Sequence, residues 1–171
     1  MADKNYTVNM RFFVSATPAP KPKTKESKQV AYFYAGLLIV MVLCQLFTFD
    51  GFLTYIESLW LPISNPMTHL LTGLIVTAEV FALPFLLGLK LSPLMRFISM
   101  VCGWFVPSVW LFLSLWINLT TNNITNAGFL GSLVDVVPGW WAVFLSASFA
   151  ILAAWASWGM WPFKSQPKIK G

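Results

Sequence analysis

Charged residues are scarce in this chain of 171 residues: they make up only 10% of it, against about 25% in an ordinary soluble domain. Hydrophobic residues account for 57% of the chain, and the mean hydropathy is +0.70. So few charges cannot cover a surface that faces water. This composition excludes an ordinary soluble domain and, over most of the length, intrinsic disorder. It indicates an integral membrane protein.

Cysteine and histidine are equally sparse. The two cysteines, Cys44 and Cys102, form no C-x-x-C motif, which excludes a thioredoxin-type pair and gives no support to a zinc site. In the apolar runs that hold them they differ in depth by about 7–8 Å, so we expect buried, unpaired thiols. The single histidine, His69, cannot supply both axial ligands of a bis-histidine haem. The sequence therefore predicts neither a metal site nor a cofactor.

Long apolar runs are abundant. Each of four runs has 20 or more residues, and about 20 helical residues cross a hydrocarbon core of roughly 30 Å. Backbone polar groups inside a bilayer must be satisfied within the protein, so these runs should be helices. The prediction is an all-α integral membrane four-helix bundle over residues 30–162. Its four spans are 30–49, 67–89, 93–118 and 139–162.

The basic residues lie in only three parts of the sequence. All 11 fall in the tail 1–29, around the connection that holds Lys90 and Arg96, or in the tail 163–171. Four spans place these three parts on one side, which the positive-inside rule makes cytoplasmic. We therefore expect both termini in the cytoplasm and a multi-pass protein of a cell membrane, such as a bacterial inner membrane. This placement argues against nucleic acid as a partner. The basic tails either only set the topology, which is the simpler interpretation, or also contact anionic headgroups of the lipid bilayer.

Two segments outside the spans differ from plain connections in composition or in the spacing of their apolar residues. Residues 1–29 are rich in Pro and Lys, and we expect a solvated, disordered tail, as for the short basic tail 163–171. Residues 50–62 instead place apolar side chains at helical spacing, with Asp50 and Glu57 elsewhere. This pattern predicts a short amphipathic helix at the membrane interface, between the first and second spans. Its apolar residues are Phe52, Tyr55, Ile56, Leu59 and Trp60.

Glu79 is the strongest candidate for a functional residue, because a carboxylate near the middle of a span is costly. Thr68 and Thr72 lie on nearly the same helical stripe, and Pro84 leaves the carbonyl of Val80 without its helical donor. Low dielectric favours a neutral carboxylic acid that donates a hydrogen bond. Glu79 is therefore either a proton-handling or ligand-binding acid or a structural acid that joins helices. Its expected polar neighbour is Thr72 on its own stripe or a group on another helix.

Gln45 is a second polar residue within a span, near the outer end of the first. It either forms a hydrogen bond between helices or contacts a ligand. Three tryptophans in the third span either line a cavity or pack in the core, and core packing is the simpler interpretation. They are Trp104, Trp110 and Trp116.

Several short segments follow one another in an order that is also found in a known family of membrane proteins. These are QLFTFDGF at 45–52, the end of the amphipathic segment at 59–62, ALPFLLGL after Glu79, and NAGFLG at 126–131. Over about residues 34–161 the chain resembles the DoxX/MauE-like family of small four-helix membrane proteins. It departs from MauE-like members in lacking the thiols of their Cys-Gly-Cys-Phe-Gly type loop, although Gly128 and Gly131 are present. Gln45 stands where DoxX-like members often have lysine.

The resemblance implies an accessory or partner subunit of a membrane-associated redox system, one that does not catalyse the chemistry alone. The alternative is a small carrier or binder of a lipophilic molecule such as a quinone, with a pocket around Glu79. A third hypothesis is a direct membrane oxidoreductase, which has the least support because no redox-active group is visible. The partners expected are therefore the bilayer and either a membrane oxidoreductase or a quinone.

Overall fold

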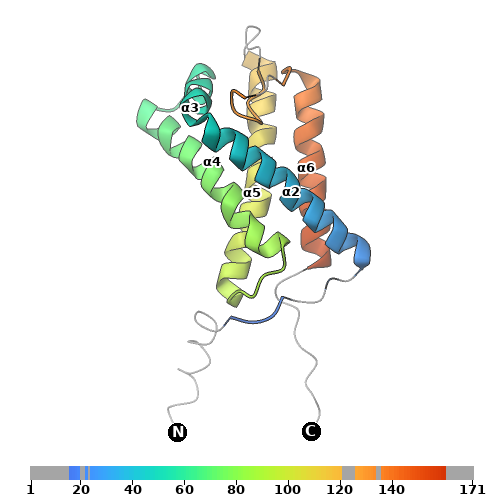
Figure 1. Cartoon of the computed structure of the whole chain (residues 1–171). Helices are drawn as coiled ribbons and strands as arrows, with labels where there is room; N and C mark the ends of the chain where they lie inside the picture. Colours follow the sequence, from blue (N-terminus) through green and yellow to red (C-terminus); the bar gives the residue numbers. More distant parts are fainter. Residues whose placement is uncertain (1–15, 20–21, 23, 121–125, 134–135, 161–171) are drawn as a thin grey trace, which may run out of the picture.

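The structure is a computed structural model of the whole chain, and it describes residues 16–19, 22, 24–120, 126–133 and 136–160. Within these residues it contains five helices and no strand (Figure 1). The helices are α2 (Lys25–Phe47), α3 (Phe49–Ser58), α4 (Asn65–Leu86), α5 (Pro93–Thr120) and α6 (Trp140–Gly159).

Four of these helices, α2, α4, α5 and α6, are long and apolar enough to cross a membrane, and they lie where the sequence predicts four spans. The first begins five residues earlier than predicted, at Lys25 instead of residue 30. The cause is a helix cap: the Thr24 hydroxyl accepts a hydrogen bond from the Ser27 N–H at 3.1 Å. The polar residues Lys25–Lys28 are therefore the first turn of α2 and not part of the tail.

Residues 16–19 do not form the solvated tail that the sequence predicted. Thr17 pairs with Leu91 in the α4–α5 connection, its N–H donating to the Leu91 carbonyl at 3.0 Å. Arg96, only 5% exposed, donates to the Thr17 carbonyl at 2.8 Å and to the Pro18 carbonyl at 3.1 Å. A buried guanidinium needs acceptors, and this segment supplies them. Residues 1–15 and the tail 163–171 lie outside the described residues.

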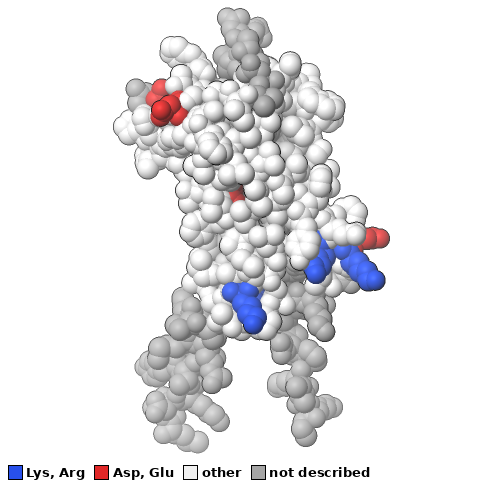
Figure 2. Space-filling model, viewed as in Figure 1, with Lys and Arg blue, Asp and Glu red and all other residues white. Residues whose placement is uncertain are grey.

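The four long helices pack in a ring, in which α2 contacts α4 and α6, and α5 contacts the same two helices. One end of the molecule holds the start of α2, the end of α4, the start of α5 and the end of α6; the other holds α3 (Figure 1). Basic residues lie toward the first end, together with one acidic residue at the start of α2, and an acidic group lies toward the α3 end (Figure 2). A nearly uncharged belt lies between the two ends (Figure 2). This separation matches the division of charge in the sequence.

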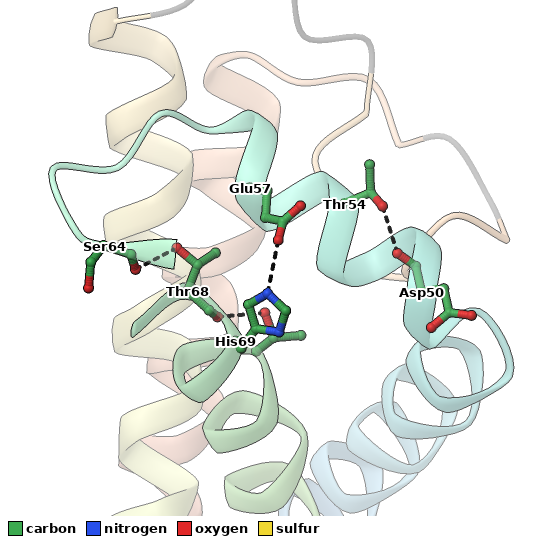
Figure 3. A network of polar contacts seen from close by, with 7 residues as sticks. Asp50, Thr54, Glu57, Ser64, Thr68 and His69 are labelled. Atoms are coloured by element: carbon green, nitrogen blue, oxygen red, sulfur yellow. Dashed lines mark hydrogen bonds and ion pairs between the residues drawn. The ribbon is translucent and has the colours of Figure 1, made fainter. Parts of the chain in front are cut away.

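The short helix α3 is amphipathic, as predicted, but it ends at Ser58. Trp60, which the sequence placed on its apolar side, lies beyond the helix and is 83% exposed. Phe52, Ile56 and Leu59 at its C-cap are fully buried, whereas Asp50 and Glu57 are exposed. On its polar side, Glu57 Oε1 lies 3.1 Å from Nε2 of His69 in the first turns of α4 (Figure 3). Buried apolar contacts and this exposed polar contact together hold α3 against α4.

Pro84 lies inside α4, near its end, and a serine from α5 completes the hydrogen bonding there. The Ser99 hydroxyl donates to the Phe81 carbonyl at 2.5 Å and accepts from the Phe85 N–H at 3.0 Å. An unbroken helix would join these two backbone groups directly. Ser99 therefore bridges the backbone of α4 beside the proline and links α4 to α5.

Candidate ligand-binding site

Glu79 lies in the middle of α4 with its side chain fully buried, at 0% exposure. Its Oε1 accepts hydrogen bonds from Gln45 Nε2 at 3.2 Å and from Trp110 Nε1 at 3.3 Å. Glu79 therefore faces the interior, as expected of an acid within a span. Three helices, α2, α4 and α5, meet at this one carboxyl group.

Thr72 is not the neighbour of Glu79 that the sequence suggested. Its hydroxyl donates to the Thr68 carbonyl of its own helix at 2.9 Å. The two side chains share a helical stripe, but seven residues separate them by about 10 Å along the axis. The polar partners of Glu79 come from other helices, which was the alternative to Thr72.

Trp110 was assigned to core packing from the sequence, and its role toward Glu79 was missed. The ring is fully buried, with its centroid 4.7 Å from that of Phe129 and 6.1 Å from that of Phe52. A buried indole N–H needs an acceptor, and Glu79 is the only carboxylate within the four apolar runs. That combination is the signal that could have connected the two residues.

Gln45 is also fully buried, and its orientation is fixed by two acceptors. Its Nε2 donates to Glu79 Oε1 and to the Phe129 carbonyl, the latter at 3.1 Å. Because a carbonyl can only accept, the amide nitrogen and not the oxygen must face Phe129. Within the described part of the chain, this orientation leaves Gln45 Oε1 without a hydrogen-bond partner, and Glu79 Oε2 has none either.

The donors around Glu79 are uncharged. Both of its hydrogen-bond donors are neutral, and among the described residues it forms no ion pair. Burying an unpaired carboxylate costs several kcal/mol, so a neutral acid is the form that suits this site. In that form Oε1 is the carbonyl oxygen that accepts two bonds, and Oε2 carries the proton.

The segment 126–131 carries Phe129 into the site and is held there by α3. The Tyr55 hydroxyl donates to the Ala127 carbonyl at 2.8 Å, and burial raises the pKa of this phenol. Gly128 has φ +77° and packs so closely on the Tyr55 ring that a Cβ would collide with it. The sequence singled out Gly128 and Gly131, but nothing in it placed this segment beside Gln45.

A cavity of about 410 Å³ lies between α2 and α6, next to the buried cluster formed by Gln45, Glu79, Trp110 and Phe129. Its walls are apolar apart from Ser148, whose hydroxyl bonds to the Phe144 carbonyl of its own helix. Glu79 does not line it, so the structure places the pocket beside the acid and not around it. Phe129 belongs to both, since it lines the cavity and contacts Gln45 and Trp110. The lining includes Leu37, Met41, Phe129, Leu145, Phe149 and Leu152.

No protein-family model, curated protein or solved structure matches this chain. Among the described residues, no group of three or more His, Cys, Asp or Glu side chains is placed to hold a metal ion.

Proposed function

We propose that this protein is a four-helix membrane bundle that binds a lipophilic molecule, such as a quinone, in the cavity between α2 and α6. The observation that carries the proposal is an apolar cavity of about 410 Å³ whose wall, at Phe129, adjoins a buried polar cluster. Small-molecule sites combine apolar walls of this kind with a few placed polar groups, in volumes of about 300–1,000 Å³.

The cavity is open to the hydrocarbon core. Phe33 and Val40 of α2 line it and are 60% and 52% exposed on the outer surface of the helices. In a bilayer that surface faces lipid tails. A lipophilic molecule dissolved in the membrane therefore enters sideways between α2 and α6, without crossing a polar headgroup layer.

The proposed orientation places the basic end in the cytoplasm. Lys25, Lys28 and Lys90 lie at the end where α2 starts and α4 ends. By the positive-inside rule this end faces the cytoplasm of a cell membrane, with both termini on that side. The amphipathic helix α3 then lies at the opposite interface, and Glu79 lies within the hydrocarbon core.

A second candidate function is that of an accessory subunit of a membrane redox system, as in the DoxX/MauE-like family. A specific observation favours it: segments that carry this resemblance meet at one site. Gln45 from QLFTFDGF contacts Glu79 and also Phe129 from NAGFLG. The segment after Glu79 continues the same helix, α4. A lipophile-binding subunit of a redox enzyme would combine both proposals.

Purification of the full chain from its own membranes in mild detergent tests these proposals. Binding of a lipophile predicts one extractable apolar molecule per chain, identified by mass spectrometry. The accessory role predicts a partner enzyme at constant stoichiometry. A chain that carries only bulk lipid and no partner would contradict both.

A further inference from the structure

Two polar atoms at the centre of the molecule have no hydrogen-bond partner among the residues that the structure describes. They are Gln45 Oε1 and Glu79 Oε2, and both side chains are 0% exposed. Buried polar atoms in proteins are nearly always paired, so an unpaired couple calls for an explanation. In the neutral acid the Glu79 atom is a donor, whereas the Gln45 atom is an acceptor. The site thus offers one donor and one acceptor.

A single hydroxyl group satisfies both atoms, because a hydroxyl donates one hydrogen bond and accepts others. The two side chains already touch, since Gln45 Nε2 lies 3.2 Å from Glu79 Oε1. The unpaired atoms therefore belong to adjoining groups. A carbonyl oxygen would satisfy only Glu79, and an ether oxygen likewise can only accept.

Phe129 lies on the path from the cavity to these atoms. Its ring stacks on Trp110 with a centroid distance of 4.7 Å and meets Phe149 edge-on at 6.0 Å, while its carbonyl binds Gln45. Met41, which lines the cavity, lies one helical turn before Gln45 on the same face of α2. A planar ring that displaced the Phe129 ring would stack on Trp110 and point a substituent at Gln45 and Glu79.

We propose that the lipophile has a hydroxyl-bearing aromatic ring of the quinol type, and that its hydroxyl binds between Glu79 and Gln45 once the Phe129 ring moves aside. This inference rests on the proposed function and adds the chemistry of the ligand head to it. It requires binding only, with no transfer of electrons by the chain.

The test compares three probes that share a decyl tail: a benzoquinol, the matching quinone and the dimethyl ether of the quinol. The full chain is reconstituted in lipid nanodiscs without oxygen, and dissociation constants are measured by equilibrium dialysis. We expect the quinol to bind about ten- to a hundredfold more tightly than the ether, because the ether leaves Gln45 Oε1 unpaired. The quinone, which can accept from Glu79 but cannot donate to Gln45, should resemble the ether.

Two variants separate the head-group site from the cavity. Gln45→Met removes the acceptor and should abolish the preference for quinol over ether. Leu145→Trp fills the cavity and should weaken the binding of all three probes. Its matched control is Phe144→Trp, at a neighbouring residue of α6 that is 67% exposed and does not line the cavity.

The outcomes distinguish the two levels of the proposal. Equal affinity for quinol and ether in the unaltered chain, with binding still weakened by Leu145→Trp, overturns the head-group inference and leaves the lipophile site standing. A buried water molecule would then be the partner of the two polar atoms. Absence of binding, or binding that Leu145→Trp does not weaken, overturns the proposed function and the inference together.

Discussion

At the scale of single residues, Glu79 organises the interior through one oxygen atom. Its Oε1 accepts N–H groups from Gln45 and Trp110, both on side chains that water does not reach. A residue that cannot accept at this position leaves two buried donors without a partner. The cost of losing the acceptor therefore outweighs the relief from removing a buried acid.

Substitutions of Glu79 should separate these effects. Glu79→Gln keeps the accepting oxygen and should change the free energy of unfolding by less than about 1 kcal/mol. Glu79→Leu leaves both N–H groups unpaired and should destabilise the protein by about 2–4 kcal/mol. Both are measured by equilibrium unfolding in mixed detergent micelles.

The matched control for Glu79 is Thr72→Val in the same helix. Thr72 is equally buried but bonds only to its own backbone, so this variant should remain close to the unaltered protein. A Glu79→Leu variant as stable as the unaltered chain would contradict the account of the two donors.

The buried cluster consists of Gln45, Glu79, Trp110 and Phe129, and sequence reasoning identified the first two as candidate site residues. Gln45 and Glu79 stood out because polar side chains within apolar runs are few. Trp110 and Phe129 did not, because their roles depend on how α5 and the segment 126–131 turn toward Glu79. Periodicity along one helix points to residues on that helix, so it favoured Thr72 over an unspecified group on another helix and could not name that group.

At the scale of elements, α4 owes its continuity past Pro84 to a residue on another helix. Ser99 of α5 bonds to both Phe81 and Phe85 in α4. Ser99→Ala would leave a backbone N–H and a carbonyl beside the proline without this partner. We expect a loss of about 1–3 kcal/mol in unfolding free energy.

The control for that substitution is Ser108→Ala, also in α5. Ser108 is exposed, and its hydroxyl bonds only to the Trp104 carbonyl one turn earlier. Its loss should change stability by less than about 0.5 kcal/mol. Equal effects of the two substitutions, in the same unfolding assay, would show that Ser99 does not support α4.

The elements themselves were largely predictable, and their ends and contacts were not. Hydropathy and length alone give four spans, and helical spacing gives α3. The early start of α2 depends on one capping hydroxyl, Thr24. The packing of residues 16–19 depends on Arg96, a buried cation that needs acceptors from a distant segment. Composition suggested a solvated tail there because it records no such long-range contacts.

At the scale of the whole molecule, the neutral form of Glu79 and the lipophile site both depend on four crossings of a bilayer. The crossings place Glu79 within the hydrocarbon core, which makes its neutral form favourable, and they expose the α2–α6 cavity to lipophiles. They also place α3 on one side and the basic ends on the other (Figure 2). The central claim is therefore this topology.

Labelling of single cysteines on intact cells tests the topology most directly, in a background with Cys44→Ala and Cys102→Ala. An impermeant thiol reagent should label Ser58→Cys and Leu133→Cys from outside, since both positions are exposed at the α3 end. Glu26→Cys and Lys90→Cys should react only after the cells are permeabilised. Labelling of Glu26→Cys and Lys90→Cys from outside, with the other two positions protected, would contradict the orientation. Labelling of all four positions from one side would contradict the four crossings and the account built on them.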